Sequence, residues 1–281
     1  MNKIKFVILP LFSMVVVLTS CGEKDLGSPI IEVDSGIIDS LLSDYDLVEG
    51  PGAAVMIIKD GEILFSNGYG LANLEDGIPN TNETNFRLAS ITKQFTAMCI
   101  MILIHHGELD FESTLTDIFS AFPSYGNNIT IRHLLNHTSG LVDYESLIQN
   151  DATEQVSDMD VYNMMTGLDS TYFTSGTDYR YSNTGYALLA MIVEVKSGLS
   201  FAAFLEENIF SPLGMTNSVA HQNGISSVNN RAYGYSQNNG EYSRDDQSLT
   251  SAVLGDGGIY TSLYEMFYWD QSLYIGQLVP L

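Results

Sequence analysis

Residues 86–96 read FRLASITKQFT, and within this stretch Ser90 stands three positions before Lys93. Residues three apart on a helix share one face, so the sequence predicts that the lysine amine reaches the serine hydroxyl. A serine hydroxyl becomes a strong nucleophile when a neighbouring base takes its proton, and a neutral lysine is such a base. The spacing therefore indicates a nucleophile with its base, and a purely structural lysine is the alternative to weigh against it.

The residues around and after Lys93 are apolar on nearly every side, which is typical of a helix buried in a core. They are Ile91, Phe95, Ala97, Met98, Cys99, Ile100, Met101, Ile102, Leu103 and Ile104. A lysine in such a helix is unfavourable unless its amine is paired or neutral. Ser90 is expected near the helix N-terminus, where unpaired backbone amides favour the negative charge of an oxyanion. Lysine is scarce in the chain and no other Ser-x-x-Lys occurs, so the catalytic interpretation is favoured.

A second polar group, Tyr181-Ser182-Asn183, follows the turn-prone residues 173–177 and precedes an apolar run. This order predicts a loop that enters a helix. A tyrosine hydroxyl can relay a proton, and an asparagine amide can hold a substrate carbonyl. The other Tyr-x-Asn match, at residues 125–127, follows a proline in a Ser/Gly/Asn-rich loop and is predicted to be a plain turn.

Several longer segments resemble, in matching order, the serine β-lactamase and penicillin-binding-protein superfamily, and in particular its class C-like branch. They are residues 86–96, 131–141 (IRHLLNHTSGL), 181–189 (YSNTGYALL), 212–215 (PLGM) and 257–262 (GGIYTS), followed by Met266 and Trp269. The resemblance spans about residues 45 to 281. It implies an α+β fold of the β-lactamase/transpeptidase type, in which an antiparallel sheet is flanked by helices and carries an all-helical insert.

The resemblance also implies roles for individual residues. Ser90 would be the acylated nucleophile, Lys93 and Tyr181 the proton-transfer pair, and Asn183 a substrate-orienting amide. The implied function is a serine acyl hydrolase that forms an acyl-enzyme and needs no cofactor. Because the branch includes class C β-lactamases, D-Ala-D-Ala carboxypeptidases, D-amino-acid peptidases and esterases, the substrate is left open among a peptidoglycan peptide, a β-lactam and an ester.

The chain departs from the family pattern at the third motif, Lys-Thr-Gly or His-x-Gly on a strand beside the site. No lysine occurs after Lys196, and His221 is followed by Gln-Asn-Gly. Lys196-Ser197-Gly198 ends an apolar helical run, where lysine and glycine are ordinary helix-stop residues. The sequence stops at Leu281, so the resemblance implies missing C-terminal strands and doubtful activity for these residues alone. The alternative function is a catalytically impaired fragment or pseudoenzyme that only binds cell-wall peptides or β-lactams.

The first 20 residues are typical of a lipoprotein signal peptide. Lys3 and Lys5 precede an apolar stretch that is too short for an ordinary membrane span, and residues 18–21 (LTSC) resemble a lipobox. Cleavage would leave Cys21 as the lipidated N-terminus, with residues 21–40 as a tether to a membrane of the bacterial cell envelope. The net charge of −23 opposes binding to nucleic acid.

The rest of the chain is predicted to form three regions. Residues 41–124 hold the first part of the α/β region with the nucleophile helix, residues 125–224 a helical region, and residues 225–281 an incomplete return to the α/β region. Within the first region, residues 53–66 read as a β-hairpin with an Asp-Gly turn. Residues 222–246 are polar and rich in Asn, Ser and Gly, which favours a long surface excursion.

No motif for a metal or a cofactor is evident. His133 and His137 have a metal-capable spacing, but no glutamate lies between them and no third ligand is obvious, so the sequence predicts structural histidines. Once Cys21 is lipidated, Cys99 has no disulfide partner and is predicted to be an apolar core residue. Neither a phosphate-binding glycine loop, nor a dinucleotide fingerprint, nor the Gly-x-Ser-x-Gly of α/β-hydrolases occurs.

Overall fold

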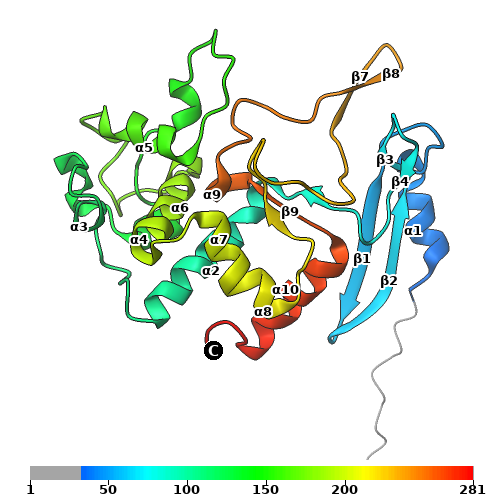
Figure 1. Cartoon of the computed structure of the whole chain (residues 1–281), viewed down its shortest axis with the longest axis horizontal. Coiled ribbons are helices and arrows are strands. Elements are labelled where there is room, and N and C mark those ends of the chain that lie inside the picture. Colours follow the sequence, from blue (N-terminus) through cyan, green and yellow to red (C-terminus); the bar gives the residue numbers. More distant parts are fainter. Residues whose placement is uncertain (1–32, 281) are drawn as a thin grey trace, which may run out of the picture. The chain divides into compact units, whose positions relative to one another are not determined.

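The computed structural model describes residues 33–280 (Figure 1). The predicted signal peptide, Cys21 and the first part of the predicted tether lie outside the described residues. The last part of the predicted tether lies in α1 (Ser35–Leu41). The Asp34 side chain accepts a hydrogen bond from the Gly36 amide at 2.9 Å and so caps this helix.

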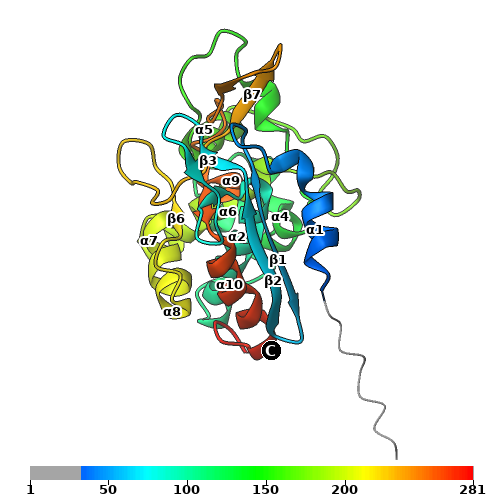
Figure 2. The same cartoon turned by 90° about the vertical axis from the view of Figure 1, so that its right-hand side faces the viewer.

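Strands β1 (Ala53–Lys59) and β2 (Glu62–Tyr69) form the antiparallel hairpin that the sequence predicts. Asp60 and Gly61 connect them with φ of 53° and 80°, the pair of positive values that a two-residue hairpin turn needs. In the part of the chain that the structure describes, β1 is paired with one strand, β2. Helix α10 (Leu263–Ile275) packs against β1 (Figure 2).

The remaining strands form small antiparallel sheets. They are the pair of β3 (Leu71–Asn73) and β4 (Ile78–Pro79), the sheet of β5 (Phe86–Arg87), β9 (Ile259–Thr261) and β6 (Val219–Ala220), and the hairpin of β7 (Tyr235–Asn238) and β8 (Glu241–Arg244). The β7–β8 hairpin belongs to the predicted surface excursion. An ion pair between Arg231 and Asp246, each 14% exposed at the side chain, fixes the base of this excursion. The polar composition of residues 222–246 does not predict this ion pair.

Helices occupy the middle of the chain, as the sequence predicts. They are α2 (Thr92–His105), α3 (Leu115–Ile118), α4 (Ile131–Leu135), α5 (Asp158–Thr166), α6 (Asn183–Ser197), α7 (Phe201–Leu205), α8 (Ser211–Leu213) and the short α9 (Leu254–Gly257). In Figure 1, helices α3 to α6 lie on one side of α2, and the β1–β2 hairpin lies on the other. The observed combination of antiparallel strands and helices confirms the predicted α+β class.

Helix α6 and the run from α7 to α8 form a bent pair. Helix α6 ends at Gly198, whose φ of 74° is the left-handed conformation of a helix cap. A π-helical stretch, Glu206–Phe210, joins α7 to α8. Within residues 33–280, no single helix is long and apolar enough to cross a membrane, and this pair, bent by 79°, reaches the required length and hydropathy only when both parts are taken together.

Helix α2 is buried along most of its length. Its most deeply buried apolar side chains are Phe95, Cys99, Ile100 and Leu103. The Phe95 ring stacks on Trp269 of α10 with ring centroids 4.0 Å apart. Trp269 also donates a hydrogen bond from Nε1 to the Gln94 side chain at 2.6 Å. These two contacts fasten α10 to the helix that carries Lys93.

Helix α9 approaches α6 so closely that a glycine is required at the contact. A Cβ atom on Gly255 would lie 2.3 Å from the backbone oxygen of Tyr186, a distance that no side-chain carbon tolerates. The Thr96 hydroxyl of α2 donates a hydrogen bond to the Gly255 carbonyl at 2.7 Å. Helices α2, α6 and α9 therefore meet at Gly255, next to Asp256.

We predict that Phe95→Ala lowers the free energy of unfolding by about 3–5 kcal/mol, because it removes a fully buried ring and leaves a cavity beside Trp269. Urea denaturation followed by the fluorescence of Trp269, the single tryptophan, measures this change. Ile91→Ala is the control, since Ile91 is half exposed and its loss is expected to change the free energy by less than about 0.5 kcal/mol. Equal losses for the two variants would contradict the importance of the stack.

Candidate active site

Ser90 lies in a short 3-10 helix, Ala89–Ile91, that runs directly into α2. The preceding residue, Ala89, has a φ of 46°, a left-handed conformation that residues other than glycine rarely adopt. Backbone strain of this kind persists where surrounding contacts hold it, and it is concentrated at functional sites. Because Ser90 is exposed, its hydroxyl is open to a substrate.

The Lys93 amine reaches the Ser90 hydroxyl, as the spacing predicts. The distance from Nζ to Oγ is 3.0 Å, and the same amine donates a hydrogen bond to the Asp256 carbonyl at 2.9 Å. Lys93 is 6% exposed, and the ring centroids of Tyr181 and Tyr186 lie 5.0 Å and 5.7 Å from its Nζ. The buried amine therefore has two protein acceptors, as a buried polar group requires.

Tyr181 approaches Ser90 from the loop that precedes α6, in the position that the sequence predicts. Its hydroxyl donates a hydrogen bond to the Ser90 Oγ at 2.8 Å. The loop ends at Ser182, whose side chain accepts a hydrogen bond from the Gly185 amide at 3.0 Å and caps α6. The structure thus brings Ser90, Lys93 and Tyr181 together at one oxygen atom.

His137 holds the Tyr181 loop in place. Its ring lies against the Tyr181 ring, with centroids 4.6 Å apart, and its Nδ1 accepts a hydrogen bond from the Ser182 amide at 3.1 Å. Burial, helped by the nearby Lys93 charge, lowers the pKa of His137 and so keeps Nδ1 free to accept. The sequence predicts a structural role for His137, and its partner, the loop that carries Tyr181, is apparent only in the folded chain.

The second histidine of the pair also bonds to the backbone. Nδ1 of His133 accepts a hydrogen bond from the Thr130 amide at 3.2 Å, within the capping box of α4. Within residues 33–280, no group of three or more His, Cys, Asp or Glu side chains is placed to hold a metal ion. Cys99 is fully buried in α2, as predicted, and this burial raises the pKa of its thiol.

Asn183 is the first residue of α6 and lies at the same pocket as Ser90. Its side-chain NH₂ donates a hydrogen bond to Oε1 of Glu145 at 2.7 Å, while its Oδ1 is buried without a partner. The pocket has a volume of about 150 Å³. Its lining consists of Arg87, Ala89, Ser90, Glu145, Asn183, Thr250, Asp256 and Gly257.

Asp256 and Tyr144 are components of the site that the sequence analysis missed. Asp256 is 6% exposed, and its carboxylate accepts a hydrogen bond from the Tyr144 hydroxyl at 2.9 Å. Burial raises the pKa of Asp256 to about 6, although the neighbouring Lys93 and the bond from Tyr144 act against this rise. The partners of Asp256 are far away in the sequence, so no local pattern marks it as part of the site. The one sign in the sequence is its position directly before the Gly257-Gly258 segment.

Lys196 does not supply a third motif at this pocket. Helix α6 starts at Asn183 beside Ser90 and ends at Ser197, so Lys196 lies about 20 Å away along the helix at about 1.5 Å per residue. Gly198 follows Ser197, the last residue of the helix, and caps it. The structure confirms the predicted helix-stop role of this segment.

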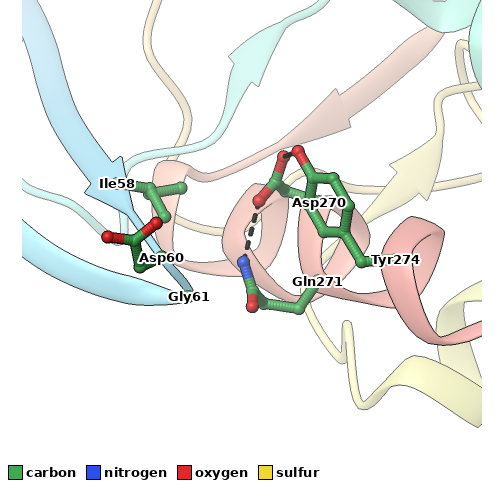
Figure 3. A pocket seen from close by; sticks show the side chains of 6 residues that line it. All are labelled: Ile58, Asp60, Gly61, Asp270, Gln271 and Tyr274. Atoms are coloured by element: carbon green, nitrogen blue, oxygen red, sulfur yellow. Dashed lines mark hydrogen bonds between the residues drawn. The ribbon is translucent and has the colours of Figure 1, made fainter.

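A larger hollow, of about 500 Å³, lies between the turn of the β1–β2 hairpin and α10 (Figure 3). It is lined by Ile58, Asp60, Gly61, Asp270, Gln271 and Tyr274. Gln271 and Tyr274 donate hydrogen bonds to the Asp270 carboxylate at 2.8 Å and 3.3 Å, and both side chains turn toward it in Figure 3. This lining contains no serine, cysteine or lysine, so the smaller pocket at Ser90 is the candidate active site.

The geometry at Ser90 suits attack on an acyl carbonyl. An exposed serine hydroxyl contacts both a buried amine and a phenol, and these are groups that can take and return its proton. Together with the α+β fold, these contacts give the Ser90 pocket the arrangement that acyl transfer to a serine requires.

Comparison with known proteins supplies the family. The family model described as Beta-lactamase matches residues 45–279, and the chain therefore belongs to this family. The chain is 34% identical over 235 residues to penicillin-binding protein 4* of Bacillus subtilis (strain 168), covering 78% of this chain and 51% of that protein. It is 31% identical over 229 residues to a D-aminopeptidase of Gluconobacter oxydans (strain 621H), covering 79% of this chain and 42% of that protein.

A solved structure agrees with this assignment. The penicillin binding protein from Bacillus halodurans matches with a TM-score of 0.73 at 30% sequence identity, and the match covers 86% of this chain and 74% of that one. The likeness confirms the predicted family and fold. The chain spans about half the length of the curated relatives it matches.

Asp158 supports α9 from helix α5. It is the first residue of α5, and its carboxylate accepts hydrogen bonds from the Leu254 and Gly255 amides at 2.8 Å and 3.1 Å. Burial raises the pKa of Asp158 to about 7, even though the two amides act to lower it. The folded protein therefore keeps a proton on Asp158 at pH values where the unfolded chain has released it.

We predict that the effect of Asp158→Asn on stability depends on pH. The raised pKa means that the parent loses free energy of unfolding as the pH rises from about 4 to about 7, whereas asparagine does not titrate. The stability of the variant relative to the parent should therefore improve by up to about 4 kcal/mol between pH 4 and pH 8, since each unit of pKa shift corresponds to about 1.4 kcal/mol. Urea denaturation at several pH values measures this difference. A difference that does not change with pH would contradict the raised pKa.

Proposed function

We propose that the chain is a serine acyl hydrolase of the β-lactamase/D-Ala-D-Ala carboxypeptidase type, which acts through an acyl-enzyme on Ser90. The observation that carries this proposal is the convergence on the Ser90 Oγ of the Lys93 amine at 3.0 Å and the Tyr181 hydroxyl at 2.8 Å. Membership of the beta-lactamase family supports the same chemistry.

In the acylation step, the Ser90 Oγ attacks the substrate carbonyl carbon and forms the new C–O bond. Lys93 and Tyr181 act as a pair that takes the hydroxyl proton, because each lies within hydrogen-bond distance of that oxygen. The bond to the leaving group then breaks, and the same pair delivers the proton to the leaving atom. Ser90 lies at the start of α2, where the helix amides favour the negative charge on the carbonyl oxygen.

In the deacylation step, a water molecule attacks the acyl carbon. The pair of Lys93 and Tyr181 takes a proton from this water, and the Ser90 Oγ recovers a proton as the ester bond breaks. The products are the free acid and the original serine. These steps use side chains of this chain and water.

Asn183 is proposed to orient the substrate through its side-chain amide at the edge of the pocket. Suitable substrates are peptidoglycan-type peptides, β-lactams and esters, because each offers a carbonyl that can acylate a serine. One curated relative is a penicillin-binding protein and another is a D-aminopeptidase, which supports a peptide or other amide as substrate.

A second candidate function is binding of cell-wall peptides or β-lactams without turnover. It also fits the geometry at Ser90, because acylation needs the nucleophile and its base, whereas turnover also needs a water molecule placed to attack the acyl carbon. In this case Ser90 would be acylated by a β-lactam, but an ester substrate would not be hydrolysed. Measuring labelling and ester turnover on the same preparation separates the two functions.

We predict that Lys93→Met slows the acylation of Ser90 by about 10²–10⁴-fold, because methionine keeps the volume of the side chain but cannot take a proton. Time-resolved labelling with a fluorophosphonate probe or a fluorescent penicillin measures the rate. Ser90→Ala is the matched control and should give no labelled protein while unfolding at the same urea concentration as the parent. Labelling of Ser90→Ala would show that Ser90 is not the nucleophile. An unchanged rate for Lys93→Met would show that Lys93 is not the base.

We also propose that the protein is anchored to a membrane of the bacterial cell envelope through a lipid on Cys21. The support is the order of a positive start, a short apolar stretch and the LTSC segment at residues 18–21. The acidic mature chain makes nucleic acid an unsuitable partner.

Cys21→Ser tests the anchor, because serine lacks the thiol that carries the lipid. We expect the parent, expressed in a bacterial host, to enter the detergent phase of a Triton X-114 separation and the Cys21→Ser variant to remain in the aqueous phase. Cys99→Ala is the control, since it leaves the lipobox cysteine intact and should partition like the parent. Partitioning that is the same with and without Cys21 would overturn the lipoprotein assignment.

A further inference from the structure

Asp256 of α9 is a buried carboxylate in the lining of the Ser90 pocket, and none of the proposed reaction steps uses it. Its residue is 6% exposed. Its backbone carbonyl accepts a hydrogen bond from the Lys93 Nζ at 2.9 Å, and the same Nζ lies 3.0 Å from the Ser90 Oγ. One residue therefore brings a negative charge close to the amine that is proposed to act as the base.

The Asp256 carboxylate is fixed by a partner that is itself fixed. Its Oδ2 accepts a hydrogen bond from the hydroxyl of Tyr144, a fully buried residue, at 2.9 Å. The Tyr144 amide donates a second bond, to the Thr184 hydroxyl of α6, at 2.9 Å. The carboxylate therefore keeps its place, because leaving it would unpair a buried hydroxyl.

Charges of both signs act on the Asp256 carboxylate. Burial raises its pKa to about 6, and the largest charge effect on it is the lowering by Lys93. The hydrogen bond from Tyr144 and the charge of Arg87 also lower the pKa, whereas the charge of Glu145 raises it. Arg87 and Glu145 belong to no ion pair within residues 33–280, so both charges remain in the pocket. Asp256 is therefore mostly ionised at neutral pH.

The interaction between Lys93 and Asp256 acts on both groups. Since the charge of Lys93 favours the ionised form of Asp256, ionised Asp256 favours the protonated form of Lys93 to the same extent. The other groups around the amine are the rings of Tyr181 and Tyr186, at 5.0 Å and 5.7 Å, and His137, whose pKa burial lowers. Asp256 thus opposes the loss of the proton that Lys93 must give up before it can act as a base.

We propose that the Asp256 carboxylate holds the Lys93 amine in its protonated form and so sets the pH above which Ser90 becomes a nucleophile. As the pH rises, Lys93 loses this proton to water, and the neutral amine then takes the hydroxyl proton of Ser90 as the C–O bond forms. Asp256 acts through Lys93 and touches no reacting atom, so it is a positioning residue. This inference rests on the proposed acyl-enzyme function and adds a residue to it.

Asp256→Asn tests the inference, because it removes the charge and keeps both the size of the side chain and the backbone carbonyl. The measurement is the rate constant for labelling of Ser90 by a fluorophosphonate, between about pH 5 and about pH 10. We expect the rate of the parent to fall on the acid side, where Lys93 is protonated. In Asp256→Asn this acid limb should move to lower pH by about 1–2 units, within the range of one nearby opposite charge, so that labelling at the foot of the parental limb becomes about 10–100-fold faster.

Two further variants separate the charge from the packing. Asp158→Asn neutralises another buried carboxylate that bonds to α9, outside the pocket lining, and should leave the acid limb in place. Tyr144→Phe keeps the Asp256 carboxylate but removes its hydrogen-bond donor, so that the carboxylate takes up a proton at higher pH. The limb should then move in the same direction as in Asp256→Asn, by a smaller amount. Added to Asp256→Asn, the Tyr144→Phe change should move the limb no further.

An acid limb at the same pH in the parent and in Asp256→Asn would overturn the inference. A loss of rate by one factor at every pH would also overturn it, because that is the effect of a merely structural role. NMR of protein labelled with carbon-13 lysine follows the Lys93 amine without any reaction, with its signal assigned from Lys93→Met. We expect the amine to lose its proton at lower pH in Asp256→Asn than in the parent.

The two measurements also distinguish this inference from the proposed function. Absence of Ser90 labelling in the parent at every pH would count against the acyl-enzyme, and the NMR titration would still test Asp256. Normal labelling together with the same Lys93 titration in the parent and in Asp256→Asn would count against the role of Asp256 alone.

Discussion

Lys93 is 6% exposed, and its amine has hydrogen-bond acceptors in two parts of the chain. One is the Ser90 hydroxyl, one helical turn away, and the other is the Asp256 carbonyl in α9. A polar group buried without partners is strongly unfavourable, so the position of α9 relative to α2 is under tight constraint. Gly255 lets α9 approach α6, and Thr96 bonds to the Gly255 carbonyl from α2. Much of the packing around the site therefore serves to place the Asp256 carbonyl within hydrogen-bond distance of the Lys93 amine.

The same residue of α9 supports two parts of the site. Asp256 accepts a hydrogen bond from Lys93 at its carbonyl and another from Tyr144 at its carboxylate. The carbonyl is a backbone group, so a substitution at Asp256 removes the bond to Tyr144 and leaves an acceptor for Lys93. Helix α2 has a further bond to α9, from the Thr96 hydroxyl to the Gly255 carbonyl, which holds the two helices together.

Local features of this fold could be predicted, because short-range geometry determines them. The turn at Asp60 and Gly61, the approach of Lys93 to Ser90 and the helix stop at Gly198 each depend on residues at most four positions apart. The approach of Tyr181 came from the family resemblance, since no spacing rule links residues 91 positions apart. The family was predicted from several segments in matching order, and the family model that matches residues 45–279 confirms it.

Other features could not be read from the sequence, for reasons that are physical. Asp256 looks like any acidic residue among glycines until its carbonyl is seen against Lys93. His137 has the spacing of a metal ligand, whereas its actual partners are the Tyr181 ring and the Ser182 amide, which depend on how a distant loop folds back. The helix that starts at Ser35 within the expected tether is capped by Asp34, and its Asp39 accepts a hydrogen bond from the Tyr69 hydroxyl, 30 positions away.

The separation of these partners along the chain has a consequence for biosynthesis. The bond between Lys93 and Asp256 joins residues 163 positions apart, and the bond between Tyr144 and Asp256 joins residues 112 positions apart. Contacts of this range form after the loops between them have closed, and they slow folding because the entropy of closure is lost before the contact is gained. The contact between Ser90 and Lys93 is local, whereas the carbonyl that holds the lysine lies beyond long loops that have to close first. Reactivity at Ser90 is therefore gained late in folding, after α9 has packed against α2.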